Sequence, residues 1–344
     1  MRQIWIPKPG PPDVLELREA PDPQPASGEV RIRVAALGVN FAEIMGRLGM
    51  YPDLPPMPVV PGYEVSGRVD AIGADVDEQW GDAQVLALTR FGGYSDTVCV
   101  PVDQVYRRPP DMDAPSGAAL PVNYVTAYQL IEVMGALRDY ETVLIHSAGG
   151  GVGIAAIQLA KHIGATVIGT ASQAKHGFLT SIGVDQCIDY QTEDFVARVN
   201  DLTGGRGVEL VLDAIGGASW KKSYRVLSHT GRLGMFGLAS AATGKQRSRL
   251  SFVRAVASIP WFTFTPPALM ARNRGVFGVN VGHLWGEIPR VRRWMDQLLD
   301  YFVTGAVAPV IDRQFTFDEA ADAHAYIQER RNIGKVLLVP DASR

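Results

Sequence analysis

The order of apolar and polar positions divides the chain into a β-rich part and a part in which strands and helices alternate. Residues 30–39 alternate apolar and polar side chains, as a half-buried strand does. Shorter patterns at 65–72 and 94–100 predict further strands. The connections between them, such as residues 51–62, are dense in proline and glycine. We therefore predict a β-rich unit in residues 1–119.

The pattern changes near residue 118. A helical segment at 118–137 comes first. Short apolar strands follow, and amphipathic stretches separate them. The predicted strands are 142–146, 166–170, 186–188, 208–213 and 231–236. Strands that alternate with helices form parallel sheets with crossover helices, so we expect an α/β fold with a doubly wound parallel sheet.

The last third of the chain extends both parts. An apolar segment from Val276 and a helix at 286–304 continue the alternating pattern. The tail from residue 308, with a helix opening near Asp318 and a strand at 335–339, is expected to rejoin the first unit. These breaks assign residues 1–119 and 308–344 to one domain and residues 120–307 to the other.

Composition narrows the classes of function. The chain has 344 residues, is 47% hydrophobic and 20% charged, and carries a net charge of −3. Lysines and arginines are scattered, so no nucleic-acid partner is indicated. Cys99 and Cys187 are too few for a disulfide framework or a cysteine-based zinc cluster. Because the first residues resemble no signal peptide, we expect a cytoplasmic protein.

One apolar, aromatic stretch at 250–270 could be mistaken for a membrane span. Arg254 and the prolines at 260, 266 and 267 interrupt it, which makes it a poor span. We therefore expect no stable membrane insertion, and a lid, a pocket wall or a subunit contact remain open interpretations.

The run at 142–153 carries the strongest chemical signal. A β-branched apolar stretch leads into Ala148-x-Gly150-x-x-Gly153, an alanine-first form of the dinucleotide-binding fingerprint, and a helical pattern follows. Backbone N–H groups and the positive helix end would receive a pyrophosphate there. A structural glycine turn is the alternative. The predicted cofactor contacts in this run are Ala148, Gly150, Gly151, Val152 and Gly153.

The next strand end favours NADPH over NADH. An NAD site places an acid about 20 residues after the fingerprint to bind the ribose hydroxyls, and residues 167–176 contain none. Ser172 and Lys175 are suited to a 2′-phosphate, with Thr170 on the same strand end and Tyr190 closing over the phosphate. The alternative is that Lys175 is a solvated helix residue.

Motifs along the whole chain resemble those of the medium-chain dehydrogenase/reductase superfamily, in its zinc-free quinone oxidoreductase branch. The resemblance rests on residues 38–43, 49–52, 61–67, 148–153 and 334–340. Residues 121–128, 169–176 and 188–190 are similar to the synaptic-vesicle amine transport protein family.

This resemblance implies a GroES-like catalytic domain, an inserted Rossmann domain, a cleft that holds NADPH, and a homodimer joined through the Rossmann sheets. Cofactor contacts that it implies by position are Gly237, Phe277, Val279 and Asn332. Zinc enzymes of the superfamily carry Cys where this chain has Asn40 and His where it has Tyr63. Because thiolate and imidazole groups hold zinc, no catalytic zinc is expected.

Chemistry without a metal would depend on positioning. Hydride moves from the nicotinamide to an electron-poor carbon, and a hydrogen-bond donor stabilises the charge on the substrate oxygen. The candidates are the Tyr51 hydroxyl and the Asn40 side chain, with Thr126 steering the nicotinamide or the substrate. Each has a structural alternative: loop packing for Tyr51, a turn cap for Asn40, and a bond to its own helix for Thr126.

The sequence thus predicts an NADPH-dependent reductase of quinones or other α,β-unsaturated carbonyls. One alternative is a 2-enoyl-thioester reductase, because related reductases use a tyrosine in a similar Gly-x-Tyr loop. Another is a weakly catalytic NADPH-binding protein that associates with membranes or lipids, which the vesicle-protein resemblance and the apolar stretch at 250–270 suggest.

Overall fold

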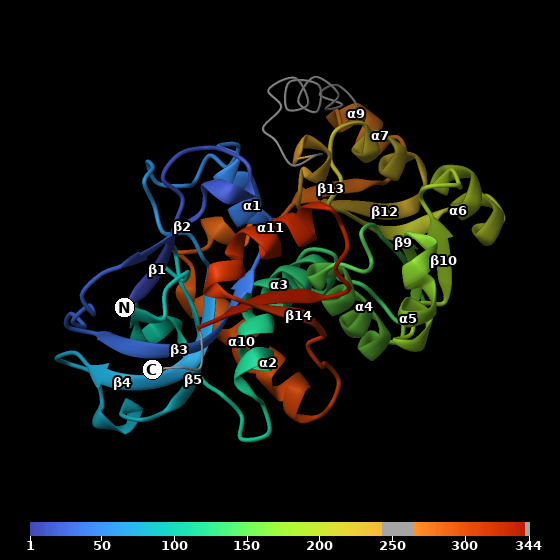
Figure 1. The fold of residues 1–344 in the computed structure, drawn as a ribbon. Coiled ribbons are helices and arrows are strands. Elements are labelled where there is room, and N and C mark those ends of the chain that lie inside the picture. The colour runs from blue at the N-terminus through green and yellow to red at the C-terminus, as the bar shows by residue number, and fades with distance from the viewer. Residues whose placement is uncertain (243–263, 341–344) are drawn as a thin grey trace. The chain divides into compact units, whose positions relative to one another are not determined.

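The structure, a computed structural model, describes residues 1–242 and 264–340 (Figure 1). These residues form two units. Unit 1 contains Met1–Val125 and the chain from Val281 onward, and unit 2 contains the described residues of 126–280. Each unit has its own main sheet.

Unit 1 is built on a seven-stranded sheet. Its strand order is β14-β15-β3-β4-β5-β7, with β6 also paired to β3. The expected strands at 30–39 and 65–72 are confirmed as β3 and β4, whereas the one expected at 94–100 begins later, as β6. The strands are β3 (Glu29–Val39), β4 (Glu64–Ile72), β5 (Gln84–Leu88), β6 (Thr97–Pro101), β7 (Val105–Arg107), β14 (Ile311–Thr316) and β15 (Lys335–Val339); β1 (Arg2–Trp5) and β2 (Glu16–Glu19) form a separate pair.

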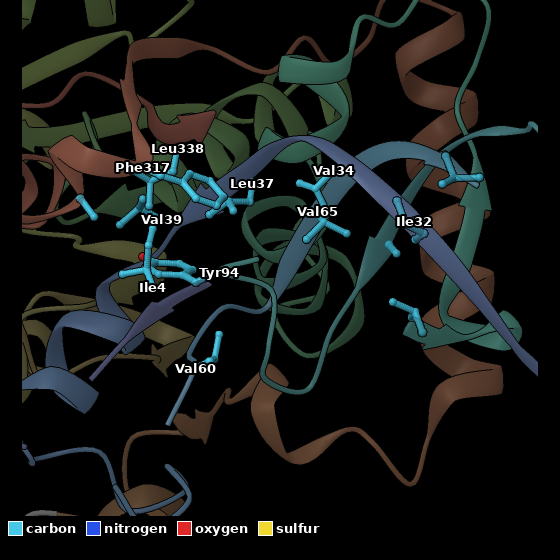
Figure 2. Packing of buried hydrophobic residues seen from close by; sticks show 14 of the residues in the cluster. Ile4, Ile32, Val34, Leu37, Val39, Val60, Val65, Tyr94, Phe317 and Leu338 are labelled. Atoms are coloured by element: carbon cyan, nitrogen blue, oxygen red, sulfur yellow. The ribbon is translucent and has the colours of Figure 1, made fainter. Parts of the chain in front are cut away.

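The core of unit 1 follows from the alternation along β3. Val30, Ile32 and Val34 are buried in the core, where Figure 2 shows Ile32 and Val34. Arg31 and Arg33 alternate with them and pair with Asp70 at 2.8 Å and 2.6 Å. Burying an aliphatic side chain of this size contributes about 1.5–3 kcal/mol. The core therefore fixes the register of β3, which in turn places the residues at its end.

The tail of the chain belongs to unit 1. The turn η8 (Phe317–Glu319) and helix α11 (Ala320–Gln328) connect β14 to β15. Strand β15 pairs antiparallel with β3, so that Val336 faces Val39. The start of the last strand therefore lies next to the end of β3.

Helix α10 (Ile288–Val303) also belongs to unit 1, although its sequence pattern placed it in the domain at 120–307. Arg292 on this helix donates to the carbonyls of Val102 and Val105 at 3.1 Å and 3.0 Å. Its guanidinium lies 4.9 Å from the centre of the Tyr106 ring. Contacts distant in sequence, which a local pattern does not reveal, thus assign α10 to unit 1.

The helical segment predicted at 118–137 is not one helix. Helix α2 (Ala114–Ala119) ends before Pro121, α3 (Pro121–Tyr128) begins at that proline, and a π-helical turn, η4, spans Gln129–Val133. Proline has no N–H to continue a preceding helix but fits well in a first turn. The prediction of a single long helix was therefore wrong.

Unit 2 contains the predicted doubly wound sheet, with all strands parallel in the order β10-β9-β8-β11-β12-β13. From β8 the chain first adds β9 and β10 on one side of that strand, and then returns to add β11, β12 and β13 on its other side. The carboxyl ends of β8 and β11 therefore flank the switch point at which such sheets bind ligands. The strands are β8 (Thr142–Ile145), β9 (Thr166–Ala171), β10 (Gln186–Asp189), β11 (Val208–Asp213), β12 (Leu227–Met235) and β13 (Gly275–Gly278).

Helices α4, α5, α6 and α7 connect the successive strands from β8 to β12. Helix α4 packs on β8 and β9, α5 packs on β10, and α7 packs on β11 and β12 (Figure 1). Their bounds are Gly151–Ile163 for α4, His176–Ser181 for α5, Phe195–Thr203 for α6 and Ala218–Arg225 for α7.

In the described residues, no helix is both long and apolar enough to cross a membrane. Most of the apolar stretch at 250–270 lies outside the described residues. Its end forms the short helix α9 (Pro266–Met270).

Candidate functional site

The glycine turn joins β8 to α4 at the switch point of unit 2. Gly150 caps the helix, which begins at Gly151 and runs for 13 residues. A Cβ atom on Gly153 would lie 2.5 Å from the Ser147 carbonyl oxygen and 2.6 Å from that of Ala148. Only glycine permits this close strand–helix packing. The turn thus presents the N-terminus of α4, with its unpaired N–H groups and positive dipole end, at the carboxyl edge of the sheet.

Lys175 extends over this turn. A Cβ atom on Gly149 would lie 2.9 Å from Lys175 Cδ and 3.8 Å from Nζ. Lys175 ends η5 (Gln173–Lys175), which Ser172 caps after β9. The structure therefore brings the predicted phosphate-binding lysine to the predicted pyrophosphate turn. Tyr190, which follows β10, is 43% exposed.

Thr170 was predicted as a cofactor contact. In the structure its buried hydroxyl hydrogen bonds to His146 Nδ1 at 3.0 Å. His146 Nε2 lies 3.1 Å from Ser223 Oγ, which donates to Asp213 Oδ2 at 2.7 Å. Since Ser223 donates to Asp213, its oxygen accepts from Nε2–H, and Nδ1 accepts from Thr170. Burial lowers the pKa of His146 and keeps the ring neutral.

Asp213 fixes the loop after β11. One carboxylate oxygen accepts the N–H groups of Ile215 and Gly216 at 2.8 Å and 3.1 Å, and the other accepts the Ser219 and Ser223 hydroxyls. The sequence predicted the strand at 208–213 but did not reveal the hydrogen bonds that join its last residue, through Ser223, to His146. A histidine directly after a buried strand was the available signal.

Three further predicted contacts lie at the ends of the last strands. A Cβ atom on Gly237 would lie 2.8 Å from the Ala214 carbonyl oxygen, so this glycine permits close approach of two loops. The Phe277 ring packs against Gly234. Val279 is buried and donates its N–H to Met235 at 2.9 Å.

Unit 1 holds a second group of predicted residues, at the start of α1 (Phe41–Arg47). Asn40 precedes this helix, and its Oδ1 accepts a hydrogen bond from Lys335 Nζ at 2.6 Å. The Lys335 ammonium also donates to Glu64 Oε1. A Cβ atom on Gly38 would lie 2.6 Å from Lys335 Cε, so the missing side chain makes room for this ion pair.

Glu43 completes this group, which we call the acid–lysine cluster: Asn40, Glu43, Glu64 and Lys335. Glu43 Oε2 accepts the backbone N–H of Asn40 at 2.7 Å. All four residues are buried. Burial raises the pKa of Glu43 to about 8, although the charge of Lys335 opposes the rise. The sequence motifs included Lys335 but gave no reason to single it out.

The cluster fixes the orientation of the Asn40 amide. Its oxygen faces the ammonium, and Nδ2 donates to Glu64 Oε1 at 3.0 Å and to Glu43 Oε1 at 3.3 Å. Both amide protons thus point to carboxyl groups. This geometry favours a positioning role for Asn40 over donation to a substrate oxygen.

Tyr51 belongs to an aromatic group in the same unit. Its ring packs edge-on against Tyr63 with centroids 6.4 Å apart, and the Tyr63 and Phe91 centroids are 5.3 Å apart. Burial raises the pKa of Tyr63, as do the charge of Glu43 and a hydrogen bond with Tyr51. The Tyr51 and Tyr63 side chains therefore lie next to each other in unit 1.

Two predicted residues remain. Thr126 lies in α3 and is half-buried. Asn332 precedes β15, where its Nδ2 donates to the Gly334 carbonyl at 2.8 Å. This bond stabilises the turn in which Gly334 adopts a φ of 91°. The amide of Asn332 thus supports the strand that begins with Lys335.

The donor set in unit 1 does not fit a zinc ion. Asn40 and Tyr63 stand at the positions where zinc enzymes carry Cys and His, and Glu64 already pairs with an ammonium, which would repel a cation. Throughout the described parts of the chain, no group of three or more His, Cys, Asp or Glu residues is arranged to hold a metal ion.

Comparison with known proteins gives matches over most of the chain. Residues 26–110 match the model of the alcohol dehydrogenase GroES-like domain, and residues 182–338 match that of the zinc-binding dehydrogenases. The synaptic vesicle membrane protein VAT-1 homolog of Rattus norvegicus is 41% identical over 95% of this chain and 80% of its own.

Solved structures extend the comparison. The human VAT-1 homolog-like protein matches with a TM-score of 0.86 and 30% identity, covering 100% of this chain and 99% of its own. The quinone oxidoreductase of Escherichia coli, crystallised with NADPH, matches with a TM-score of 0.87 and 26% identity, covering 99% of this chain and 100% of its own. The chain therefore belongs to the medium-chain dehydrogenase/reductase superfamily, in the branch of the VAT-1 homologs and quinone oxidoreductase-like proteins.

Proposed function

We propose that the protein is an NADPH-dependent oxidoreductase that reduces a quinone or another α,β-unsaturated carbonyl without a metal. The observation that carries this proposal is Lys175 over the glycine turn at the N-terminus of α4. A positive side chain at a helix N-terminus suits a phosphorylated ligand. The E. coli relative crystallised with NADPH supports the same assignment.

Unit 2 would hold the cofactor through main-chain and side-chain groups. The N–H groups of Gly151 and Gly153 would receive the pyrophosphate, whereas the Gly150 N–H already donates to the Ser147 carbonyl oxygen at 2.9 Å. Ser172 and Lys175 would bind the 2′-phosphate. When bound, NADPH supplies a hydride. Asp213 and His146 would keep the loops at the carboxyl edge in place for it.

Unit 1 would supply the proton donor. Tyr51 would donate to the substrate oxygen as negative charge develops there, since a positioned donor is most effective on the charge of the transition state. Tyr63 would orient the Tyr51 hydroxyl through their hydrogen bond. Asn40 would hold the start of α1, and Thr126 stays a predicted contact of nicotinamide or substrate.

Cofactor binding tests the first half of the proposal. Titration of the purified protein with NADPH and with NADH should show tighter binding of NADPH. Lys175→Ala should weaken NADPH binding by roughly tenfold to a hundredfold, the loss expected for a charged hydrogen bond, and leave NADH binding unchanged. Lys161→Ala is a matched control, because Lys161 lies at the other end of α4 and pairs with Asp185. An equal effect on both cofactors would refute the assignment of Lys175 to the 2′-phosphate.

Turnover tests the second half. Phenanthrenequinone should oxidise NADPH faster than NADH, and crotonyl-CoA should react more slowly than the quinone. Faster turnover of crotonyl-CoA would favour an enoyl-thioester reductase instead. Binding to liposomes without turnover of either compound would favour a lipid-associated role. The homodimer implied by the family stays a prediction, which sedimentation analysis would test.

A further inference from the structure

An ion pair at the surface of unit 1 ties the loop that carries Tyr51 to a distant part of the chain. His283 Nε2 lies 2.8 Å from Asp53 Oδ2, and the two residues are 230 positions apart. Asp53 follows Tyr51 in the same loop, and His283 ends the turn η7 (Val281–His283). Both residues of the pair belong to unit 1. The pair therefore connects the loop of the candidate proton donor to the segment that leads into α10.

The histidine side of this pair is held by a firmly packed helix. Helix α10 begins at Ile288, shortly after His283 along the chain. It buries the side chains of Met295 and Leu298 completely, and its Arg292 donates to carbonyl groups of unit 1. Such burial stabilises the position of a helix strongly. His283 is thus attached to a rigid element.

The loop side of the pair folds back on α1. A Cβ atom on Gly46 would lie 3.3 Å from Leu54 Cδ1, so Leu54 packs against the helix. The Leu54 N–H donates to the Tyr51 carbonyl at 3.3 Å and closes a turn that contains Asp53. Pro52 stands between Tyr51 and Asp53, and its ring restricts the backbone there. A movement of Asp53 is therefore passed on to Tyr51.

The exposure of the pair limits what it contributes. The side chain of His283 is 62% exposed and that of Asp53 is 35% exposed, so solvent screens their attraction. Such a pair adds little to the stability of a whole protein. Loops, however, open with far smaller free energies than the whole fold, so even a screened ion pair changes how often a loop is open.

The attraction in this pair depends on pH. Histidine is the side chain that gains its positive charge between about pH 8 and pH 5, where a carboxylate stays ionised. Glu287 and Arg290, on the segment after η7, pair with each other at 3.5 Å. On the loop side, the charge of Asp53 reaches Tyr63, whose pKa is raised by burial, so that Tyr63 keeps its proton. The charge that changes in this pH range is therefore that of His283.

We propose that the His283–Asp53 pair positions the Tyr51 hydroxyl for proton donation, and that protonation of His283 makes this positioning firmer. Both are positioning residues, since neither is proposed to touch the substrate or the cofactor. The part of the proposal that concerns Tyr51 rests on the proposed reductase function. The ordering of the loop needs neither cofactor nor substrate.

Hydrogen–deuterium exchange of the amides in residues 49–54 of the cofactor-free protein tests the ordering of the loop. At about pH 6, His283→Gln and Asp53→Asn should exchange these amides about twofold to fivefold faster than the wild type, which is the effect of an exposed ion pair. At about pH 8 the difference for His283→Gln should shrink, because the wild-type imidazole is then neutral. His283→Lys should exchange more slowly than His283→Gln at both pH values, because an ammonium keeps its charge.

Glu287→Gln is the matched control for these variants. It breaks the similarly exposed pair with Arg290 on the neighbouring segment and leaves His283 and Asp53 in place. The amides of residues 49–54 should exchange in this variant as in the wild type. Equal exchange in the wild type and His283→Gln at about pH 6 would overturn the proposal, as would an equal acceleration in Glu287→Gln.

Turnover tests the effect on Tyr51. With phenanthrenequinone, His283→Gln should lower kcat about twofold to fivefold at about pH 6 and less at about pH 8. The affinity for NADPH should not change, because the glycine turn and Lys175 lie in unit 2. His283→Lys should restore the rate at the lower pH. Faster exchange in the loop without any change in kcat would overturn the positioning of Tyr51. If the wild type reduces no quinone, the proposed function fails, whereas the exchange data still decide whether the pair orders the loop.

Discussion

Lys335 Nζ donates to Asn40 Oδ1 at 2.6 Å and so joins the first residue of the last strand to the residue that precedes α1. The antiparallel register of β15 on β3 places the two residues opposite each other. Glu64, the first residue of β4, completes the ion pair. Three neighbouring strands thus bring their ends together at one charged, buried point.

Removing the ammonium should destabilise unit 1 markedly. Lys335→Met leaves Glu64 as a buried carboxylate without its cation, a change that costs about 3–5 kcal/mol. Urea unfolding measures the loss, with the exposed Lys8→Met as the control. Adding Glu64→Gln should restore part of the stability. A loss no greater than that of the control would contradict the assigned pair.

The stability of the protein should depend on the protonation of Glu43. The folded-state pKa of about 8 lies above the ordinary value of 4.5, so the native state binds the proton more tightly than the unfolded state. The contribution is therefore complete at pH values below the ordinary pKa and is lost as the pH rises through the folded-state pKa, by on the order of a few kcal/mol.

Urea unfolding of wild type and Glu43→Gln at about pH 5, pH 7 and pH 9 measures this dependence. The difference in stability between the two proteins should change in favour of the variant as the pH rises. A difference that stays constant over this range would show that Glu43 is ionised in the folded protein at all these pH values.

The sequence predicted the elements better than the cluster, for a physical reason. The strands of unit 2 are short apolar runs, and the turn at 148–153 is a contiguous motif, so both are visible in a local window. Lys335 and Asn40 are 295 positions apart, and their contact depends on strand pairing. In the sequence, Lys335 looks like an ordinary polar residue at the start of a strand, although its side chain is buried in the structure.

Contacts between distant residues also determine the places of helix α10 and of His146. The amphipathic pattern of α10 identified the helix, but the Arg292 bonds that assign it to unit 1 involve distant residues. His146 was a lone histidine after a strand, and its partners Thr170 and Ser223 lie 24 and 77 positions away. Local patterns identified elements, and long-range polar contacts determined the sites.

The close packing of the glycine turn predicts opposite effects at two glycines. In Gly153→Ala the added methyl group would lie 2.5 Å from the Ser147 oxygen and would push α4 away from β8, which should weaken NADPH binding and lower the Tm. Gly177→Ala is a matched control in α5, because its Cβ atom would meet nothing within 4 Å. Alanine should stabilise that helix by about 0.5–1 kcal/mol. Calorimetry and NADPH titration measure both effects, and equal behaviour would contradict the described packing.

Asp213 should couple loop order to cofactor affinity. In Asp213→Asn an amide replaces an oxygen that accepts two bonds, so either the hydroxyls of Ser219 and Ser223 or the N–H groups of the loop lose their acceptor. We expect a loss of stability of about 1–3 kcal/mol and weaker NADPH binding. Asp201→Asn, on the exposed side of α6, is the control. Unaltered NADPH affinity would mean that the loop after β11 does not contribute to the cofactor site.

The hydroxyl of Tyr51 should affect the rate more than the fold. Tyr51→Phe keeps the ring edge against Tyr63 and removes the group proposed to donate to the substrate oxygen. Loss of such a donor lowers kcat by roughly a hundredfold to a thousandfold. NADPH affinity and Tm should change little, and Tyr140→Phe, whose side chain is 80% exposed, should behave like the wild type. Steady-state kinetics with phenanthrenequinone measures the change. An unchanged kcat would assign Tyr51 to packing and leave the proton transfer to another donor.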